Sequence, residues 1–433
     1  MFAATGDLIP YYALYALLFA DHGFGPGQIS LLLAFWSVTA FLFEVPSGAW
    51  ADTVSRRGLL ILNGLLMAAG FVVWTVAPSY VGFALGFVLW GVASSLRSGT
   101  FEALVYDELA ARGAARAYAR VIGYTRSASE TSAVIAILAA TPLYLWGGYQ
   151  LVGWVSVGCA VAHTLLAASL PAAPKSVSAA EVDEFEDAVA PAAAAPVVIT
   201  PSPRPAIVGP GADEQAVGEH GTLRRYLRML RTGVAEAVRV RLVRHGVVLG
   251  ALLYGITAFD EYFGLVAGEA GAATSFVPVL VGVTVLGSLT GSLLAGRTEA
   301  VAARVLARAL GVAGVLFGAG AVVAGLAVRW PGAVYVCTGL GFAAIAAAYG
   351  VVYNAAIVAE ARLQDAISGP ARATVMSVSG LLEELVSLAV FGFVALATLW
   401  LSVATTIALL GIAIVALAGL TPFWLPPRPA PAK

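Results

Sequence analysis

Charged residues are scarce in this chain. They make up 11% of its 433 residues, whereas 60% are hydrophobic and the mean hydropathy is +0.88. A soluble domain has about 25% charged residues, so a fold of this composition has too little polar surface to face water. Apolar runs of about 20 residues, the length of helix that crosses a bilayer, recur along the sequence. The composition therefore predicts an all-α, multi-pass protein in a lipid bilayer, because a helix satisfies its own backbone hydrogen bonds.

Other scarcities exclude several classes of site. The only cysteines, Cys159 and Cys337, fall in apolar runs, so we expect no disulfide or zinc framework. The four histidines are scattered and form no metal-spaced pair. Lysine occurs only at Lys175 and Lys433, and neither follows a glycine-rich loop, so the chain lacks a Walker A site for ATP. We expect no enzyme activity, no cofactor, no metal site and no nucleic-acid partner.

Turn signals divide the apolar runs into twelve predicted spans. The first run lacks a basic leading region and a small-residue cleavage site, so we expect a span there and not a signal peptide. The predicted spans are 3–20, 28–50, 59–77, 80–106, 118–143, 149–170, 245–267, 274–296, 302–327, 332–359, 372–397 and 399–421.

The interruption after the sixth span predicts the domain organisation. Residues 171–220 are rich in alanine, proline and acids and show no helical stripe, which is typical of a disordered linker. Residues 223–246 are basic, with apolar positions at helical spacing, which suits a helix on the membrane surface. The predicted units are an N-terminal six-helix bundle (1–170), a cytoplasmic linker (171–244), a C-terminal six-helix bundle (245–421) and a tail (422–433).

Arginine is distributed unevenly between the two sides of the predicted spans. The loops on the side of the N-terminus contain nearly all of it, whereas the loops on the other side contain only Arg329. By the positive-inside rule, this asymmetry predicts that both termini and the linker are cytoplasmic and that the chain lies in the inner (plasma) membrane. The predicted inside loops contain Arg56, Arg57, Arg112, Arg116, Arg120, Arg297, Arg304, Arg308, Arg362 and Arg372.

The stretch "GAWADTVSRR" (48–57) lies between the second and third predicted spans. It resembles the loop motif of the major facilitator superfamily, in which an aspartate follows a glycine by four residues and paired basic residues come next. The resemblance implies two six-helix halves, a monomer and secondary transport by alternating access. It also implies a latch whose contacts hold the inner gate in one state. The implied gating residues are Gly48, Asp52, Arg56 and Arg57, with Glu44 close by.

This stretch departs from the family pattern in one place, and its counterpart departs in another. Val54 and Ser55 stand where the family commonly has a glycine before the basic pair. In the matching segment of the second half, "GSLLAGR" (291–297), Ala295 stands where an acid would be. We therefore expect a one-sided latch. The alternative interpretation is an ordinary polar turn that obeys the positive-inside rule.

Two arginines, Arg97 and Arg126, lie inside predicted spans, where a charge needs a partner or a wet cavity. "RSGTFEA" (97–103) resembles the fourth-span arginine motif of drug/proton antiporters in this superfamily, which implies a role for Arg97 in proton coupling. Glu102 would lie about 140° round a continuous helix from Arg97, so we expect Arg97 to reach another helix. Arg126 and Glu130 are four residues apart and share a face, so they can pair, for function or for structure alone.

Several acids also lie inside predicted spans and are candidates, with Glu102, for proton coupling or substrate binding. Adjacent acids point about 100° apart on a helix, so we expect one of each pair to face the cavity. Glu130 and Glu383 lie at similar depths in the fifth and eleventh spans, a weak sign of a repeat. Asp107 and Glu108 fall at the membrane interface, where water can solvate them. The acids within spans are Asp7, Glu130, Asp260, Glu261, Glu383 and Glu384.

Together these features predict a proton-coupled transporter that exports small organic or amphipathic molecules. A buried carboxyl group takes up a proton readily, and an arginine that moves close to it favours release. The fifth span lacks the Gly/Pro-rich motif of many exporters in the superfamily, so the direction of transport stays open. The alternative is an importer of a polar or anionic nutrient whose negative charge Arg97 and Arg126 bind. A membrane enzyme or a non-transporting receptor is a third interpretation.

Overall fold

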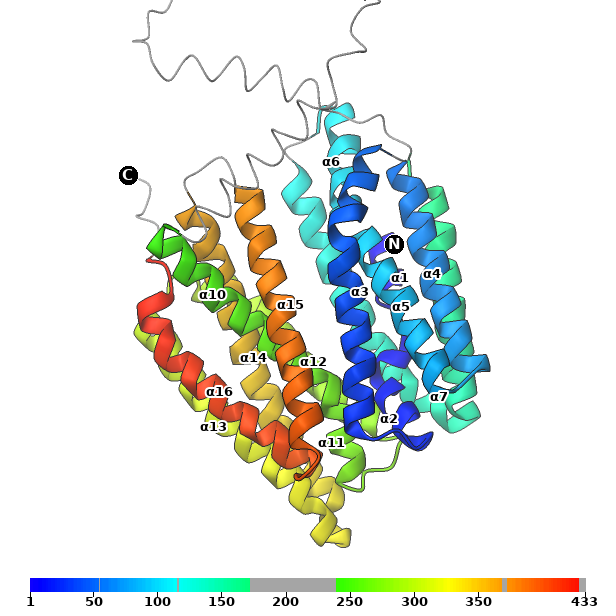
Figure 1. Cartoon of the computed structure of the whole chain (residues 1–433), viewed down its shortest axis with the longest axis vertical. Coiled ribbons are helices and arrows are strands. Elements are labelled where there is room, and N and C mark those ends of the chain that lie inside the picture. The colour runs from blue at the N-terminus through cyan, green and yellow to red at the C-terminus, as the bar shows by residue number, and fades with distance from the viewer. Residues whose placement is uncertain (54, 115–116, 172–238, 368–371, 428–433) are drawn as a thin grey trace, which may run out of the picture.

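The computed structural model describes residues 1–53, 55–114, 117–171, 239–367 and 372–427. Within these ranges the regular elements are α-helices and short 3-10 helices, arranged in two bundles side by side (Figure 1). This arrangement confirms the prediction of an all-α membrane fold. The predicted linker falls mostly on residues 172–238, which lie outside the described residues, so its disorder and its surface helix stay predictions.

The N-terminal bundle contains the first six crossings, and three places in it depart from a simple helix. The first crossing is divided into three short pieces. The fourth is broken at Ser98–Gly99, where Gly99 has φ +68°, a conformation that favours glycine. The helix of 52 residues that ends this bundle is interrupted at Gly147–Gly148. The elements are α1 (Phe2–Gly6), η1 (Pro10–Ala13), α2 (Tyr15–Asp21), α3 (Pro26–Thr53), α4 (Arg56–Val76), α5 (Tyr80–Arg97), α6 (Thr100–Ala111) and α7 (Tyr118–Ser169).

The C-terminal bundle contains the other six crossings. Its first crossing is also interrupted, because a 3-10 helix, η4, separates two α-helical pieces. The elements are α10 (Arg241–Gly255), η4 (Ile256–Tyr262), α11 (Phe263–Glu269), α12 (Val277–Thr298), α13 (Ala303–Leu326), η5 (Ala327–Arg329), η6 (Pro331–Ala333), α14 (Val334–Ala366), α15 (Arg372–Ala397) and α16 (Val403–Trp424). The first helix therefore begins four residues before the predicted boundary at 245.

The number of crossings agrees with the sequence-based expectation. Ten stretches of the described chain are long and apolar enough to cross a membrane. One of them, Arg120–Ser169, contains two crossings, because a straight helix of 50 residues would be about 75 Å long against a hydrocarbon core of about 30 Å. The divided first crossing, residues 2–21, contains no single helix of sufficient length. With these two additions the described chain crosses twelve times.

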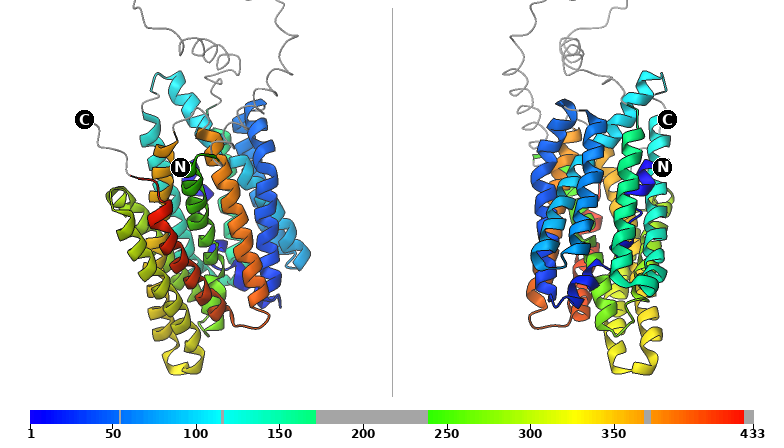
Figure 2. Two further views of the ribbon diagram at one scale, coloured as in Figure 1. Left: turned by 60° about the vertical axis from the view of Figure 1, so that its left-hand side comes forward. Right: turned by 90° about the vertical axis from the view of Figure 1, so that its right-hand side faces the viewer.

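The two ends of the molecule carry different connections. We call the end that holds α6, the end of α3 and the start of α10 the linker end, and the opposite end the far end (Figures 1 and 2). The bundles meet through α3 with α15 and through α7 with α12. Ser30 Oγ lies 2.8 Å from Tyr262 OH, and Thr141 donates to Ser275 O at 2.8 Å, both close to the far end. At the linker end α3 and α15 lie farther apart (Figure 1).

Glycines let α12 and α14 approach closely in the C-terminal bundle. A Cβ on Gly287 would lie 2.1 Å from Ala346 O, and one on Gly291 would lie 2.1 Å from Gly350 O. Any side chain at these two positions would therefore push the helices apart. Close backbone contact of this kind is a main source of helix association in a membrane, where lipid removes the hydrophobic driving force.

Candidate functional site

Both bundles begin with an interrupted crossing that carries acids at the interruption. In the first bundle, Asp7 follows α1 with φ −110° and ψ 7°, and the chain resumes in η1. In the second bundle, Asp260 and Glu261 lie in η4, between α10 and α11. Interrupted helices at corresponding positions of two repeats are typical of substrate and ion sites in membrane proteins built from repeats. Asp7, Asp260 and Glu261 are therefore candidates for substrate or ion binding.

A pocket of about 200 Å³ in the N-terminal bundle brings together four charged residues that the sequence singled out. Arg97 comes from the last turn of α5 and Glu102 from the first turn of α6, while Arg126 and Glu130 come from α7. The 140° separation expected for Arg97 and Glu102 assumed one continuous helix, and the break at Ser98–Gly99 places both in one pocket instead. The other lining residues are Phe2, Ala3, Phe101, Thr125 and Ser129.

Arg97 reaches a different segment, as expected. Its Nη2 lies 3.7 Å from Asp7 Oδ2, and the two side chains are 41% and 24% exposed. An ion pair this accessible is screened by water and holds its partners with little free energy. The pair can therefore separate when its surroundings change.

Arg126 and Glu130 share a face of α7, as expected, and both line the pocket. Although both residues are described, they form no ion pair within 4 Å, and the guanidinium of Arg126 acts on the carboxylate of Glu130 at longer range. Glu130 also faces Ser292 of α12, in the other bundle. This places the Glu130 carboxylate where the two bundles meet.

The two acids of η4 have different neighbours. Asp260 Oδ2 accepts a hydrogen bond of 2.7 Å from Tyr349 OH of α14, within its own bundle. Glu261 lies within electrostatic range of Tyr12 in the N-terminal bundle and of Tyr349 in its own bundle. Tyr12 is also in range of Arg97.

The two acids of α15, Glu383 and Glu384, also have different neighbours. Glu384 accepts a hydrogen bond from Ser37 Oγ of α3, across the interface between the bundles. Glu383 lies within electrostatic range of Glu360 and Tyr254, in its own bundle. Tyr254 OH in turn donates to Glu360 Oε2 at 3.1 Å. Glu360 of α14 is thus an acid of this group that sequence analysis did not single out.

The motif between α3 and α4 is only partly described. The surroundings of Gly48 and the side chain of Asp52 are not described, so the role of these two residues in a latch stays a prediction. Arg56 forms an ion pair with Asp107 of α6, and its Nη1 donates to Ala103 O at 3.3 Å. Asp107 is 6% exposed, so the expectation that water solvates it is wrong. The guanidinium of Arg56, and not water, lies against this carboxylate.

Other charged residues lie in this motif or near it. Glu44 is exposed, and Ser98 Oγ donates to its Oε1 at 2.7 Å, which ties α3 to the break in the fourth crossing. Arg57 lies in the first turn of α4 and is half-buried. Glu108 pairs with the exposed Arg112 one turn later, as suits an interface. The Glu44 carboxylate therefore lies beside the break that follows Arg97.

Sequence analysis also missed a buried histidine beside the pocket. His163 of α7 is fully buried, and its Nε2 lies 3.2 Å from Asn63 Oδ1 of α4. Its Nδ1 lies 3.1 Å from Phe2 O and 3.1 Å from Thr5 Oγ1. The sequence contains a signal for it, because His163 is an ionisable residue inside the predicted span 149–170, and such a residue is a candidate functional position. A single histidine forms no metal-spaced pair, so the metal criterion does not detect it.

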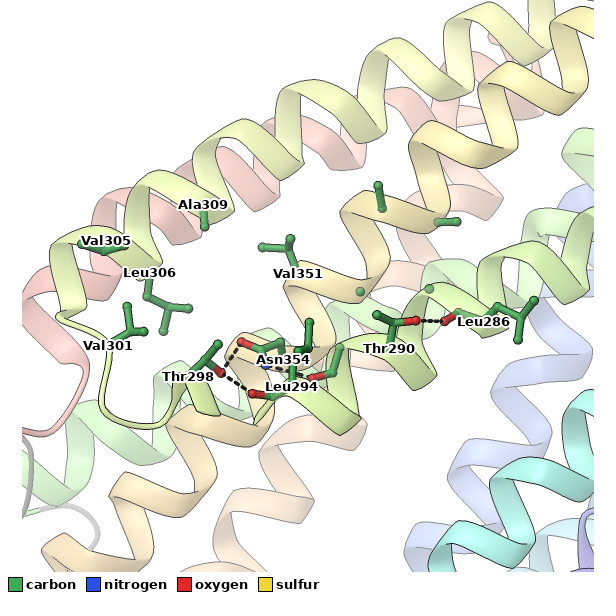
Figure 3. A pocket seen from close by; sticks show the side chains of 15 residues that line it. Leu286, Thr290, Leu294, Thr298, Val301, Val305, Leu306, Ala309, Val351 and Asn354 are labelled. Atoms are coloured by element: carbon green, nitrogen blue, oxygen red, sulfur yellow. Dashed lines mark hydrogen bonds between the residues drawn. The ribbon is translucent and has the colours of Figure 1, made fainter. Parts of the chain in front are cut away.

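A larger cavity of about 540 Å³ lies in the C-terminal bundle, between α12, α13 and α14, and it is lined by uncharged residues (Figure 3). Its main polar groups satisfy one another, because Thr298 Oγ1 donates to Asn354 Oδ1 at 2.9 Å and Asn354 Nδ2 donates to Gly291 O at 2.9 Å. Such a cavity can hold an apolar molecule but offers no group that binds a proton. The charged pocket is therefore the better candidate site.

Comparison with solved structures agrees with this fold, although no curated protein sequence matches the chain. A D-xylose-proton symporter is 14% identical, with 99% of this chain and 97% of that chain covered and a TM-score of 0.64. A mutant of the peptide transporter POT is 11% identical, with 97% and 92% covered and a TM-score of 0.62. The nucleoside transporter NupG, also a mutant, is 11% identical, with 98% and 96% covered and a TM-score of 0.61. At these identities the likeness shows the fold alone.

Comparison of the sequence with protein-family profiles identifies the family. The profile described as Major Facilitator Superfamily matches residues 1–382, which is most of the chain. The match includes the loop motif, both interrupted crossings and the charged pocket. The chain therefore belongs to the Major Facilitator Superfamily and is a secondary transporter, not an enzyme.

Proposed function

We propose that this chain is a proton-coupled transporter that exports small organic or amphipathic molecules by alternating access. The observation that carries the proposal is the pocket in which Arg97, Glu102, Arg126 and Glu130 line one space of about 200 Å³. Four ionisable groups inside a membrane bundle are costly unless the space is wet and the charges are used. The two phenylalanines of the lining, Phe2 and Phe101, add an apolar wall suited to an amphipathic substrate.

In this proposal Arg97 is the charge that moves and Glu130 is the group that carries the proton. Little free energy holds Arg97 to Asp7, because the pair is long and exposed to water. Glu130 faces Ser292 of the other bundle, so rocking of the bundles changes its surroundings. A carboxylate beside a guanidinium stays ionised, whereas one moved into apolar surroundings takes up a proton. Rocking would thus link proton binding to the access state.

The remaining acids extend this proposal across the molecule. Asp7 and Glu261 would take part near Tyr12, which lies in electrostatic range of both. Glu384 would respond to rocking through its bond to Ser37, which spans the two bundles. Asp260 and Glu383 would act within the C-terminal bundle, where Tyr349 already holds Asp260.

The gate and the orientation belong to the same proposal. We place the linker end in the cytoplasm, together with both termini, because Arg56, Arg57, Arg297 and Arg304 all lie there. The described state, joined near the far end, would then open toward the cytoplasm. The latch residues at 48–57 would close the inner gate in the opposite state. We propose a monomer in the plasma membrane, as the family resemblance implies.

A specific observation favours a second candidate, the import of a polar or anionic nutrient. Arg97 and Arg126 line the same pocket, and the Arg126 side chain is exposed. A substrate carboxylate or phosphate would find two guanidinium groups there, the side chains best suited to bind it. One of the solved structures with this fold is a D-xylose-proton symporter, and this likeness supports the second candidate.

Reconstituted liposomes with a trapped pH dye separate the two candidates. Ethidium, benzoate, glycylglycine and xylose serve as probes, each tested under pH gradients of both signs and against protein-free liposomes. Export predicts that ethidium moves against protons, so that its addition drives protons in the opposite direction. Proton movement in the same direction as benzoate would favour the second candidate. Probe flux that ignores the pH gradient would contradict proton coupling in both.

A further inference from the structure

His163 lies against the charged pocket but has no part in the mechanism so far. Its ring stacks on Phe2, a lining residue of the pocket, with centroids 4.2 Å apart. Gly6 separates it from Arg97, since a Cβ on Gly6 would lie 3.2 Å from His163 Cε1 and 2.8 Å from Arg97 Nη1. The guanidinium and the imidazole are therefore no more than about 6 Å apart.

The hydrogen bonds around His163 fix one ring nitrogen as a donor. Asn63 Nδ2 donates to Ala93 O at 2.7 Å, which leaves Asn63 Oδ1 to face the ring. His163 Nε2, 3.2 Å from that oxygen, must therefore carry a proton. The hydrogen bond from Asn63 Nδ2 to Ala93 O determines the orientation of the Asn63 amide, and this orientation determines the tautomer of His163.

The other ring nitrogen lies beside a group that can serve either protonation state. Nδ1 lies 3.1 Å from Phe2 O, which only accepts, and 3.1 Å from Thr5 Oγ1. The Thr5 hydroxyl has one proton and lies 2.9 Å from Phe2 O. When Nδ1 is bare, Thr5 can turn its proton to it. When Nδ1 is protonated, it donates to Phe2 O. Both states are thus satisfied without any movement of the helices.

The two charged residues near the ring have opposite effects on a protonated imidazole. Arg97, from α5, repels a positive imidazolium, whereas Asp7, after α1, attracts one and is itself paired with Arg97 at 3.7 Å. The group that α4 presents to the ring, Asn63, is neutral. Departure of Arg97 would leave Asp7 as the charge facing the ring, and the charged form would then become favourable.

We propose that His163 is a second proton-binding group, which takes up a proton when Arg97 moves away and releases it when Arg97 returns. The inference rests on the proposed proton-coupled function. The only covalent change is the N–H bond at Nδ1, which forms when a proton from water binds and breaks when the proton returns to water. In this role His163 would hold the proton while Arg97 binds an acid or the substrate.

Histidine NMR tests the inference without a substrate. The full chain, labelled with ¹⁵N-histidine in lipid nanodiscs, has four histidines, and His163→Gln identifies the signal. We expect Arg97→Gln to raise the ratio of charged to neutral His163 at pH 6 about tenfold. A like charge at about 6 Å would account for about a hundredfold at an effective dielectric constant near 20, and the exposure of Arg97 reduces this by screening. Arg97→Lys, which keeps the charge, should behave as the unmodified chain does.

A second variant covers failure of the first to fold. Asn63→Asp places a negative charge beside Nε2 and should also raise the charged fraction, with Asn63→Gln as the neutral control. An equal charged fraction in the unmodified chain and in whichever of these variants folds, from pH 5 to pH 8, would overturn the inference. If His163 responds to Arg97 but a pH gradient drives no flux, the proposed function fails instead. If flux is driven and His163 does not respond, this inference alone fails.

Discussion

Arg56, at the start of α4, forms an ion pair with the buried carboxylate of Asp107 in α6. Both residues belong to the N-terminal bundle, so the proposed rocking of the bundles would leave this contact unchanged. A latch contact would form in one state only, so the proposed latch would depend on the other contacts of residues 48–57. The pair joins α6, the second half of the fourth crossing, to the start of α4.

The first prediction concerns this pair. Asp107→Ala should lower the free energy of unfolding by about 2–4 kcal/mol, because it removes a buried carboxylate that pairs with the guanidinium of Arg56. Asp107→Asn, which keeps the volume and one acceptor, should cost less. Unfolding of the purified protein in mixed detergent micelles measures the difference.

Glu108→Ala is the matched control for that change. Glu108 is the next residue and also pairs with an arginine, but Arg112 is 69% exposed, so its loss should cost less than about 1 kcal/mol. Equal losses of stability in Asp107→Ala and Glu108→Ala would show that burial of the Arg56–Asp107 pair has no energetic weight.

The second prediction concerns coupling. Arg97→Ala should abolish flux driven by a pH gradient, and Glu130→Gln should reduce it at least tenfold while substrate still binds. The reason is that, in the proposed mechanism, the first removes the charge that drives proton release and the second removes the proton carrier. Proton movement in liposomes measures both. Arg329→Ala, a change in a loop between α13 and α14, is the control and should leave flux unchanged. Full gradient-driven flux in both pocket variants would make these residues structural.

The third prediction concerns the contact between α12 and α14. Gly287→Ala should destabilise the C-terminal bundle by about 1–3 kcal/mol, because its Cβ would meet the backbone oxygen of Ala346. Gly296→Ala is the control on the same helix, since no atom lies within 4 Å of a Cβ there. Thermal unfolding followed by size-exclusion chromatography compares them. A control as unstable as Gly287→Ala would contradict the proposed role of close packing.

The fourth prediction concerns the linker. Deletion of residues 176–215 should leave transport nearly unchanged if the basic segment 223–244 is kept, because their composition buries too little apolar surface to offset the entropy of ordering. The yield of folded protein and the flux in liposomes measure the outcome. Loss of folded protein after the deletion would show that these residues pack against the bundles.

The membrane fold could be predicted because its signals are local. Apolar runs of sufficient length and the turn residues between them follow from the requirement that each helix satisfies its backbone in lipid. The same reasoning identified Arg97, Glu102, Arg126 and Glu130, because a charge inside an apolar run is visible in the sequence alone. These four do line one pocket.

Partners could not be predicted, because they depend on where separate helices meet. The sequence suggested that Arg126 and Glu130 can pair directly, yet they lie near each other without an ion pair. It also suggested that water solvates Asp107, whereas this carboxylate forms an ion pair with Arg56. A helical-wheel angle also fails where the helix breaks, as at Gly99 with its positive φ. Such a break depends on the backbone conformation of a single residue, and a hydrophobic pattern that repeats along a helix does not reveal it.

The sequence by itself determined that this chain crosses a membrane twelve times, in two halves, with ionisable groups inside. That information lies in hydropathy and spacing, which each segment carries independently of the others. Only the tertiary structure decided that Arg97 faces both Asp7 and His163, and that Glu384 accepts a hydrogen bond from Ser37 of the other bundle. These relationships join residues up to several hundred positions apart, and packing of the helices, not local propensity, brings them together.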